Sequence, residues 1–141
     1  MGSVRRILCL ANSQKQRGRC VAGREILASG PGPWIRPVSF RRHQEVSYDE
    51  QECIDGTDSN VMDVIDIPLL ERRPDGCQTE NWLLDPDRCW RRVRMSDWSE
   101  LKSYVENPPT LWINGRSTAA GTNDEVPLAA ADELPGSLYL I

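Results

Sequence analysis

The sequence predicts a mainly β protein, with its strands closed or nearly closed into one small barrel or into two fused ones. Three observations favour this class over a layered α/β fold: six or seven short extended segments, a single convincing helix, and ten prolines in 141 residues. The length is that of one domain. We therefore expect residues 1–141 to form a single compact unit.

The N-terminal runs predict a hairpin and a third strand. Residues 4–10 (VRRILCL) are rich in aliphatic side chains and indicate a buried strand, and residues 19–27 alternate loosely after a polar loop. The Gly-Pro-Gly-Pro stretch at 30–33 predicts a break in the chain. Residues 34–38 resume as an extended segment, where Pro37 requires an edge position or a strand end because it has no N–H.

The middle of the chain is less regular. Residues 39–60 lack periodicity and predict a long irregular segment. Residues 61–70 (VMDVIDIPLL) are the clearest strand of the sequence, and a bulge or twist is expected in it because Asp63 and Asp66 do not share one face of a simple alternation. Residues 78–86 predict one helical turn or an irregular segment.

One helix is expected, near residues 96–106. Asp97 and Glu100 have the spacing of a capping box, and an apolar stripe on this helix places Trp98 in the core. The remaining predicted strands cover residues 89–95 and 137–141.

Charge is segregated along the chain, although the net charge is only −4. Residues 1–42 hold nine basic residues and one acid, whereas residues 43–71 hold nine acids and no base. Fifteen of the seventeen basic residues are arginine, whose planar fork of donors suits phosphates and base edges, so the pattern favours polyanion recognition. Two other interpretations stay open: the two segments can pair with each other across the surface, or residues 43–71 can cover the basic face until a ligand displaces them.

The motifs of catalysis, metal binding and nucleotide hydrolysis are missing from the sequence. His43 is the only histidine, no two cysteines are closer than eleven residues, and neither phosphate-loop pattern occurs. We therefore expect no enzymatic activity, no cofactor and no metal. Five widely spaced cysteines predict reduced thiols. The absence of a long apolar run or a signal-like N-terminus predicts a cytoplasmic protein without membrane contact.

Tryptophan beside arginine is the pattern that points to nucleic acid. On a strand, Trp34 and Arg36 would share a face, and Trp90 adjoins two arginines. Bases stack on aromatic rings while arginine holds phosphates, but tryptophans can equally fill the core of an aliphatic-poor fold. The candidate nucleic-acid-binding residues are Asn12, Lys15, Arg17, Arg19, Trp34, Arg36, Arg41, Arg42, Asn81, Trp82, Trp90, Arg91, Arg92, Asn114 and Arg116.

Several strings of the sequence together resemble the dual OB-containing domain, a family of small bacterial proteins and modules. They are CLANS, GRCVAG, WIRPVS, VIDIPLL, QTENWLLDP, LWINGRS and GSLYLI, and the resemblance runs from Ile7 to Ile141. It implies two OB-like barrels packed as one unit, with halves at about residues 1–70 and 71–141, and a nucleic-acid-binding or sensing role, in some members within bacterial conflict or antiphage systems. It implies no catalytic residue. The polar and aromatic positions of the family map onto Asn12, Ser13, Gly18, Arg19, Trp34, Arg36, Ser39, Glu80, Asn81, Trp82, Asn114, Gly115 and Ser117.

Two functions of different classes follow. The first is a non-catalytic module of OB type that binds or senses nucleic acid, single-stranded rather than double-stranded, with DNA and RNA both open. The alternative is a protein-interaction or scaffold subunit whose partner is encoded nearby. The acidic segment at residues 43–71 and the lack of catalytic groups favour this alternative.

Overall fold

Strands dominate the computed structural model, which describes residues 2–108, 118–120 and 127–141. The strands in this part of the chain are β1 (Ser3–Lys15), β2 (Gly18–Leu27), β3 (Gly30–Val38), β4 (Asp63–Arg72), β5 (Asn81–Leu84) and β6 (Arg91–Met95). The helices there are short: α1 (Tyr48–Gln51), α2 (Trp98–Leu101), the 3₁₀ helix η1 (Lys102–Tyr104) and α3 (Leu128–Ala131). The predicted mainly β class is confirmed. No helix among the described residues is long and apolar enough to span a membrane.

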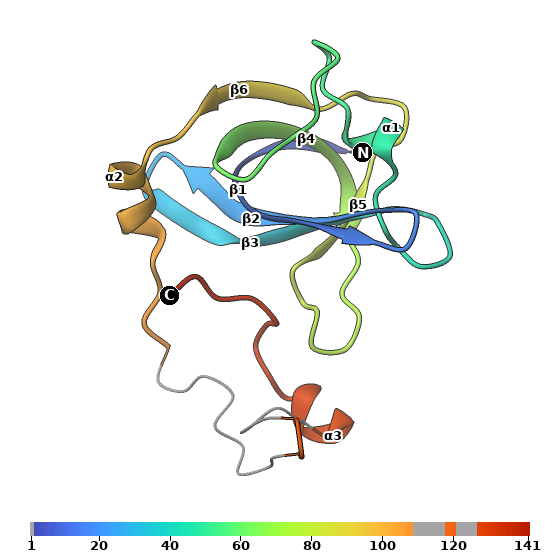
Figure 1. Cartoon of the computed structure of the whole chain (residues 1–141), viewed down its shortest axis with the longest axis vertical. Coiled ribbons are helices and arrows are strands. Elements are labelled where there is room, and N and C mark those ends of the chain that lie inside the picture. The colour runs from blue at the N-terminus through green and yellow to red at the C-terminus, as the bar shows by residue number, and fades with distance from the viewer. Residues whose placement is uncertain (1, 109–117, 121–126) are drawn as a thin grey trace.

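The strands form one sheet that closes in a ring (Figure 1). Their order is β1-β2-β3-β5-β4-β6, and β1 also pairs with β4. The pairing of β3 with β5 is parallel, whereas the other strand pairs are antiparallel. Because β5 and β6 follow residue 70 and pair with strands that begin before it, the ring takes strands from both sides of that residue. The division into two OB-like halves stays a prediction.

Alternation along the strands sends side chains to two separate apolar clusters. On β1, Ile7 and Cys9 pack in the main core, and Leu8 between them packs in a second cluster with Val64 and Tyr104. The main core holds Ile7, Cys9, Val21, Ile35, Val46, Cys53, Ile65, Ile67, Leu69, Leu84 and Trp90. Residues of α2 and of the C-terminal end cover the second cluster. The sheet is therefore apolar on both faces along β1 and β4.

The bulge predicted around Asp63 and Asp66 is confirmed. The register between β4 and β6 shifts between Val64 and Ile65, and both carboxylates are buried. The helix near 96–106 is also present, but its Trp98 is 77% exposed, so the expected core position of that side chain is wrong. The helix instead packs on the second cluster through Leu101 and the following Tyr104, and Trp98 in its first turn points away from that cluster.

Three other expectations about the strands are wrong. Residues 81–84 form β5 instead of a helical turn, because they pair with β3 and β4, which are distant in sequence. The Gly-Pro-Gly-Pro stretch at 30–33 begins β3 instead of breaking the chain, since the φ of proline suits an extended backbone. Residues 137–141 form no strand. Their Leu140 carbonyl accepts a hydrogen bond from the Glu106 N–H at 2.7 Å, and the backbone N–H groups of Ser137 and Leu140 donate to the side chains of Glu80 and Glu106.

Candidate nucleic-acid interface

The tip of the β1–β2 hairpin is fixed against the segment that follows β3 (Figure 1). Arg19 and Val46 exchange two backbone hydrogen bonds, of 2.7 and 2.9 Å. Gly18 makes this approach possible, because a Cβ atom there would lie 2.2 Å from the Val46 carbonyl oxygen. Two basic stretches of the sequence, residues 15–19 and 41–42, are thereby brought side by side.

Positive charge gathers at this junction. We call Lys15, Arg17, Arg19, Arg41 and Arg42 the basic face. Within the described part of the chain, Lys15, Arg17 and Arg42 are exposed and form no ion pair. Arg41 pairs with Glu45 at 3.2 Å, and the guanidinium of Arg19 lies over the Tyr48 ring at 5.7 Å. Three of the five cations are thus free to meet an external anion.

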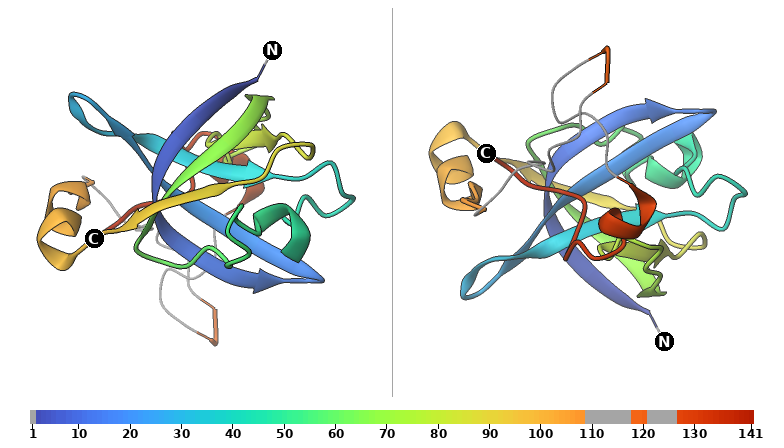
Figure 2. Two further views of the ribbon diagram at one scale, coloured as in Figure 1. Left: turned by 90° about the horizontal axis from the view of Figure 1, so that it is seen from above. Right: turned by 90° about the horizontal axis from the view of Figure 1, so that it is seen from below.

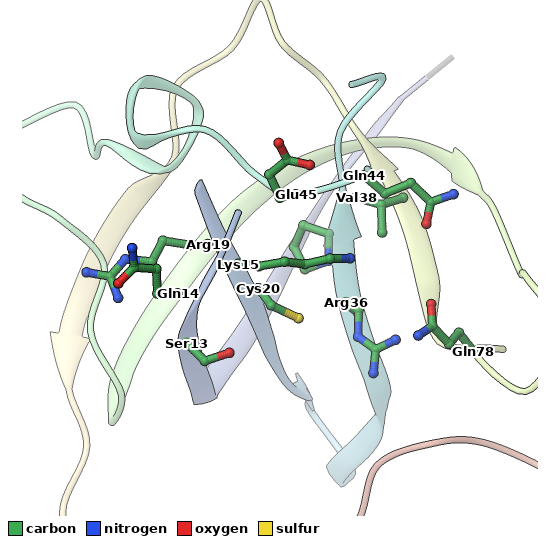
Figure 3. A pocket seen from close by; sticks show the side chains of 11 residues that line it. Ser13, Gln14, Lys15, Arg19, Cys20, Arg36, Val38, Gln44, Glu45 and Gln78 are labelled. Carbon is green, nitrogen blue, oxygen red and sulfur yellow. The ribbon is translucent and has the colours of Figure 1, made fainter. Parts of the chain in front are cut away.

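Three adjoining depressions follow the basic face in the part of the molecule that the structure describes. The first, a hollow of about 330 Å³, is lined by Lys15, Arg19 and Arg36 (Figure 3). The second, of about 420 Å³, shares Glu45 with the first, and the third, of about 350 Å³, shares Arg19 with it. The predicted site residues that line one or another of these depressions are Asn12, Lys15, Arg17, Arg19, Arg36, Arg41 and Arg42.

The predicted pair Trp34 and Arg36 does not form an open binding face. The Arg36 guanidinium is buried, with Nη2 at 2.9 Å from the Glu80 carboxylate and at 2.9 Å from the Ser137 hydroxyl. The Trp34 indole N–H donates to Glu106 at 2.9 Å. Figure 2 shows the C-terminal segment running across this end of the ring, so the segment and its polar partners occupy the strand face that was expected to meet a ligand.

The other tryptophans of the predicted site are also engaged inside the protein. Trp90 has none of its surface exposed and is a core residue here, not a stacking surface. Trp82 packs partly against the same core and carries the Arg5 guanidinium 5.0 Å above its ring. Asn81 is fully buried and accepts a hydrogen bond from Arg36 at 3.4 Å. Because an aromatic ring must be exposed to stack on a base, none of these residues extends the basic face.

The two predicted arginines of β6 are exposed but lie opposite buried acids of β4. Arg91 contacts Asp66 at 2.7 Å, and Arg92 lies 3.7 Å from Asp63. Hydrogen bonds from Arg6, and then from Arg91, hold the pKa of Asp66 below its usual value. The interpretation that residues 1–42 and residues 43–71 pair with each other describes Arg6, which contacts Asp66 at 2.7 Å, and Arg41, whereas it does not describe Lys15, Arg17 and Arg42. Asn114 and Arg116 lie outside the described residues, as do Gly115 and Ser117.

Two exposed aromatic residues beside the basic face are absent from the sequence prediction. Phe40 is 62% exposed and immediately precedes Arg41, and Tyr48 is 46% exposed beneath Arg19. A pattern restricted to tryptophan beside arginine does not include Phe40, the only phenylalanine of the chain, although it directly precedes two arginines. These two rings are exposed beside the basic face, whereas the Trp82 and Trp90 rings of the predicted site pack against the core.

Titratable groups at the basic face show no arrangement for metal binding. In the described ranges, no group of three or more histidine, cysteine, aspartate or glutamate side chains could hold a metal ion. The face offers cations, amides, hydroxyls and aromatic rings, which together suit an anionic, π-rich ligand.

Comparison with known proteins gives one family. The model of the dual OB-containing domain matches residues 5–141 of the chain. No curated protein and no solved structure matches it significantly.

Proposed function

This chain belongs to the dual OB-containing domain family, and on that premise we propose that it is a non-catalytic module that binds single-stranded nucleic acid across its basic face. OB folds bind oligonucleotides on the face of strands 2 and 3 and on the loops that connect strands 1 to 2 and strands 4 to 5. Arg17 lies in the turn between β1 and β2, and Gln78 lies in the loop between β4 and β5. Gln78 lines the same hollow as Lys15, so the two loops meet at the basic face.

The observation that carries this proposal is the set of unpaired cations beside exposed aromatic rings. Lys15, Arg17 and Arg42 can each contact a phosphate without first breaking an ion pair of the described chain. Phe40 and Tyr48 offer exposed rings next to them. Bases can reach such rings when they are unstacked, which favours a single strand over a duplex.

The proposal is tested by the salt dependence of oligonucleotide binding, measured by fluorescence anisotropy with single-stranded DNA and RNA of roughly 10–16 nucleotides. Three phosphate contacts predict a slope of about −2 for log K against log salt, at about −0.7 per contact. The double variant Arg17→Ala/Arg42→Ala should make this slope less steep by about 1.4. The matched control is Arg88→Ala/Lys102→Ala, which removes two exposed cations outside the basic face.

A second variant separates stacking from charge. Phe40→Ala should lower affinity by about 1–3 kcal/mol per stacked base and leave the salt slope unchanged. Equal losses in the basic-face variant and its control, or no binding of either nucleic acid at low salt, would refute the proposal. A place in a bacterial defence or conflict system is a further part of the proposal, supported by the family resemblance alone, and is tested by phage plating on the native host with and without the gene.

A protein-interaction subunit is the second candidate function. Met95 at the end of β6 and Trp98 at the start of α2 are 70% and 77% exposed, and exposed large apolar side chains favour a protein partner. A partner that remains bound in a pull-down after nuclease treatment, and that Trp98→Ser releases, would support this function. A pull-down that recovers only nucleic-acid-dependent proteins would exclude it.

A further inference from the structure

Residues 135–140 cross β3 on the face that carries Arg36, and we call them the covering segment (Figure 2). At one end of this segment, the Pro135 carbonyl accepts a hydrogen bond at 2.7 Å from the hydroxyl of Thr79, in the loop between β4 and β5. In its middle, the Ser137 hydroxyl accepts a hydrogen bond at 2.9 Å from Arg36 on β3. The covering segment therefore lies over a loop and a strand that OB folds use to bind oligonucleotides.

The covering segment is attached mainly through hydrogen bonds to side chains. Glu80 accepts hydrogen bonds from the N–H of Ser137, at 3.3 Å, and from its hydroxyl, and Glu106 accepts one from the Leu140 N–H at 3.0 Å. Leu140 packs at the margin of the cluster around Leu8, but no residue of the covering segment is buried and none lies in a strand. Displacing the segment therefore breaks a few hydrogen bonds, which water can replace, and leaves the core packing in place.

An aromatic ring and an unpaired cation lie together at the covering segment. A recess of about 320 Å³ is lined by Trp34 and Arg72 from the sheet and by Leu138 and Tyr139 from the covering segment. Arg72 is exposed and donates a hydrogen bond to the Thr79 carbonyl at 3.0 Å, but it forms no ion pair among the residues that the structure describes. Trp34 and Arg72 thus repeat the combination that the basic face offers to bases and phosphates.

The covering segment begins where the hollow of about 330 Å³ at the basic face ends. Arg36 lines that hollow together with Lys15 and Gln78, and the same guanidinium donates to Ser137 of the covering segment. A strand that lies in the hollow and continues along β3 toward Trp34 therefore meets the covering segment. One OB fold contacts about 4–16 nucleotides, so a short strand fits beside the segment and a longer one competes with it.

We propose that the covering segment is an internal competitor of the nucleic acid, and that a strand long enough to pass Arg36 displaces it and gains contacts with Trp34 and Arg72. This inference rests on the proposed function and concerns the regulation of the same site. The ion pair of Arg36 with Glu80, at 2.9 Å, stays in place, because neither side chain belongs to the covering segment. Affinity for a long strand is then reduced in proportion to the fraction of molecules in which the segment is open.

The first test measures anisotropy at constant salt with single strands of about 4 and about 12 nucleotides. The release variant Ser137→Ala/Leu140→Ala removes the hydroxyl and the apolar side chain that hold the covering segment. If about a tenth of the parent molecules are open, release should raise affinity for the long strand by about tenfold and leave the short strand unchanged. The control Leu128→Ala replaces a leucine that is 77% exposed and should change neither affinity. Melting temperatures check that each variant is folded.

Hydrogen–deuterium exchange of the parent protein detects the displacement directly. The long strand should speed exchange in residues 137–140, because the N–H groups of Ser137 and Leu140 lose their carboxylate acceptors, and the short strand should not. Slower exchange there with the long strand would overturn the inference, since the segment would then belong to the bound site.

The binding outcomes separate this inference from the proposed function. A parent and a release variant that bind both strands with the same ratio of affinities overturn the inference and leave the proposed function in place. Binding of the long strand by the release variant alone supports both. Failure of both proteins to bind any oligonucleotide at low salt overturns both.

Discussion

Replacing Arg36 by methionine would leave the carboxylate of Glu80 buried without its cation. The Nη2–Oε1 distance is 2.9 Å, and the two side chains are only 11% and 4% exposed. Removing one partner of a buried ion pair costs about 3–5 kcal/mol, because the remaining charge is uncompensated. Glu80 keeps its hydrogen bonds from the backbone and hydroxyl of Ser137, which places Arg36→Met at the lower end of this range.

Urea unfolding followed by tryptophan fluorescence measures this cost. With a slope of about 2 kcal/mol per molar, within the range for small proteins, a loss of about 3 kcal/mol lowers the midpoint by about 1.5 M. Arg36→Met/Glu80→Gln should regain most of the loss, because the buried charge is gone. The exposed pair of Arg73 and Glu71, 3.8 Å apart, is the control, and Arg73→Ala should cost less than about 1 kcal/mol. An Arg36→Met protein with the stability of the parent but without oligonucleotide affinity would refute the structural role. It would indicate that Arg36 contacts the ligand directly.

Three further predictions concern individual side chains: Asp66, whose pKa is lowered mainly by a hydrogen bond from Arg6, the thiol of Cys9, and the rings of Trp90 and Trp98. Because the pKa of Asp66 is lowered in the folded protein, Asp66 contributes fully to the free energy of unfolding above its unfolded pKa of about 3.9, and this contribution is lost as the pH falls through the lower folded pKa. Asp66→Asn should therefore remove this part of the decrease in the urea midpoint at acidic pH. An Asp66→Asn protein with the same pH dependence as the parent would contradict the argument. Burial raises the pKa of Cys9 to about 12, so mass spectrometry after thiol labelling at about pH 8 should find exposed Cys89 modified in the native protein and Cys9 only after unfolding. Trp90→Ala should cost about 3–5 kcal/mol of stability and Trp98→Ser less than about 0.5 kcal/mol, and similar melting temperatures would show that their burial is not as described.

Local sequence pattern predicted the strands whose partners are close in the chain. Residues 4–10 and 19–27 lie in β1 and β2, which pair as a hairpin, so alternation and a polar turn were sufficient signals. The four residues of β5 carry no such signal, because their extended state depends on parallel pairing with β3 in a register that joins Arg36 to Asn81. The apolar run at residues 137–141 shows the opposite case. It resembles a strand, but Leu140 instead covers the cluster around Leu8.

The candidate site was predicted in part for the same reason. The basic residues of the β1–β2 hairpin are close in sequence, and Lys15 and Arg17 do lie on the basic face. The sequence could not distinguish buried from exposed tryptophans, because the exposure of an indole depends on which parts of the folded sheet lie over it. Trp90 is enclosed by strands, whereas Trp98, expected in the core, is exposed. Composition shows that aromatic and basic residues are abundant, but only the fold shows which of them share a surface.

The pairing of β1 with β4, which closes the ring, also affects how the chain folds. Ile7 and Ile65 are partners across β1 and β4, whereas β1, β2 and β3 are joined by short turns. Loop entropy favours the short-range meander first, so the ring closes late and folding should take roughly milliseconds to seconds, as in other sheets with distant contacts. Until β4 docks, the backbone groups along one side of β1 remain unpaired, and such an edge can recruit a strand from another chain. Closure thus removes an aggregation-prone edge, and substitutions that delay the docking of β4 should raise the yield of misfolded protein during refolding at high concentration.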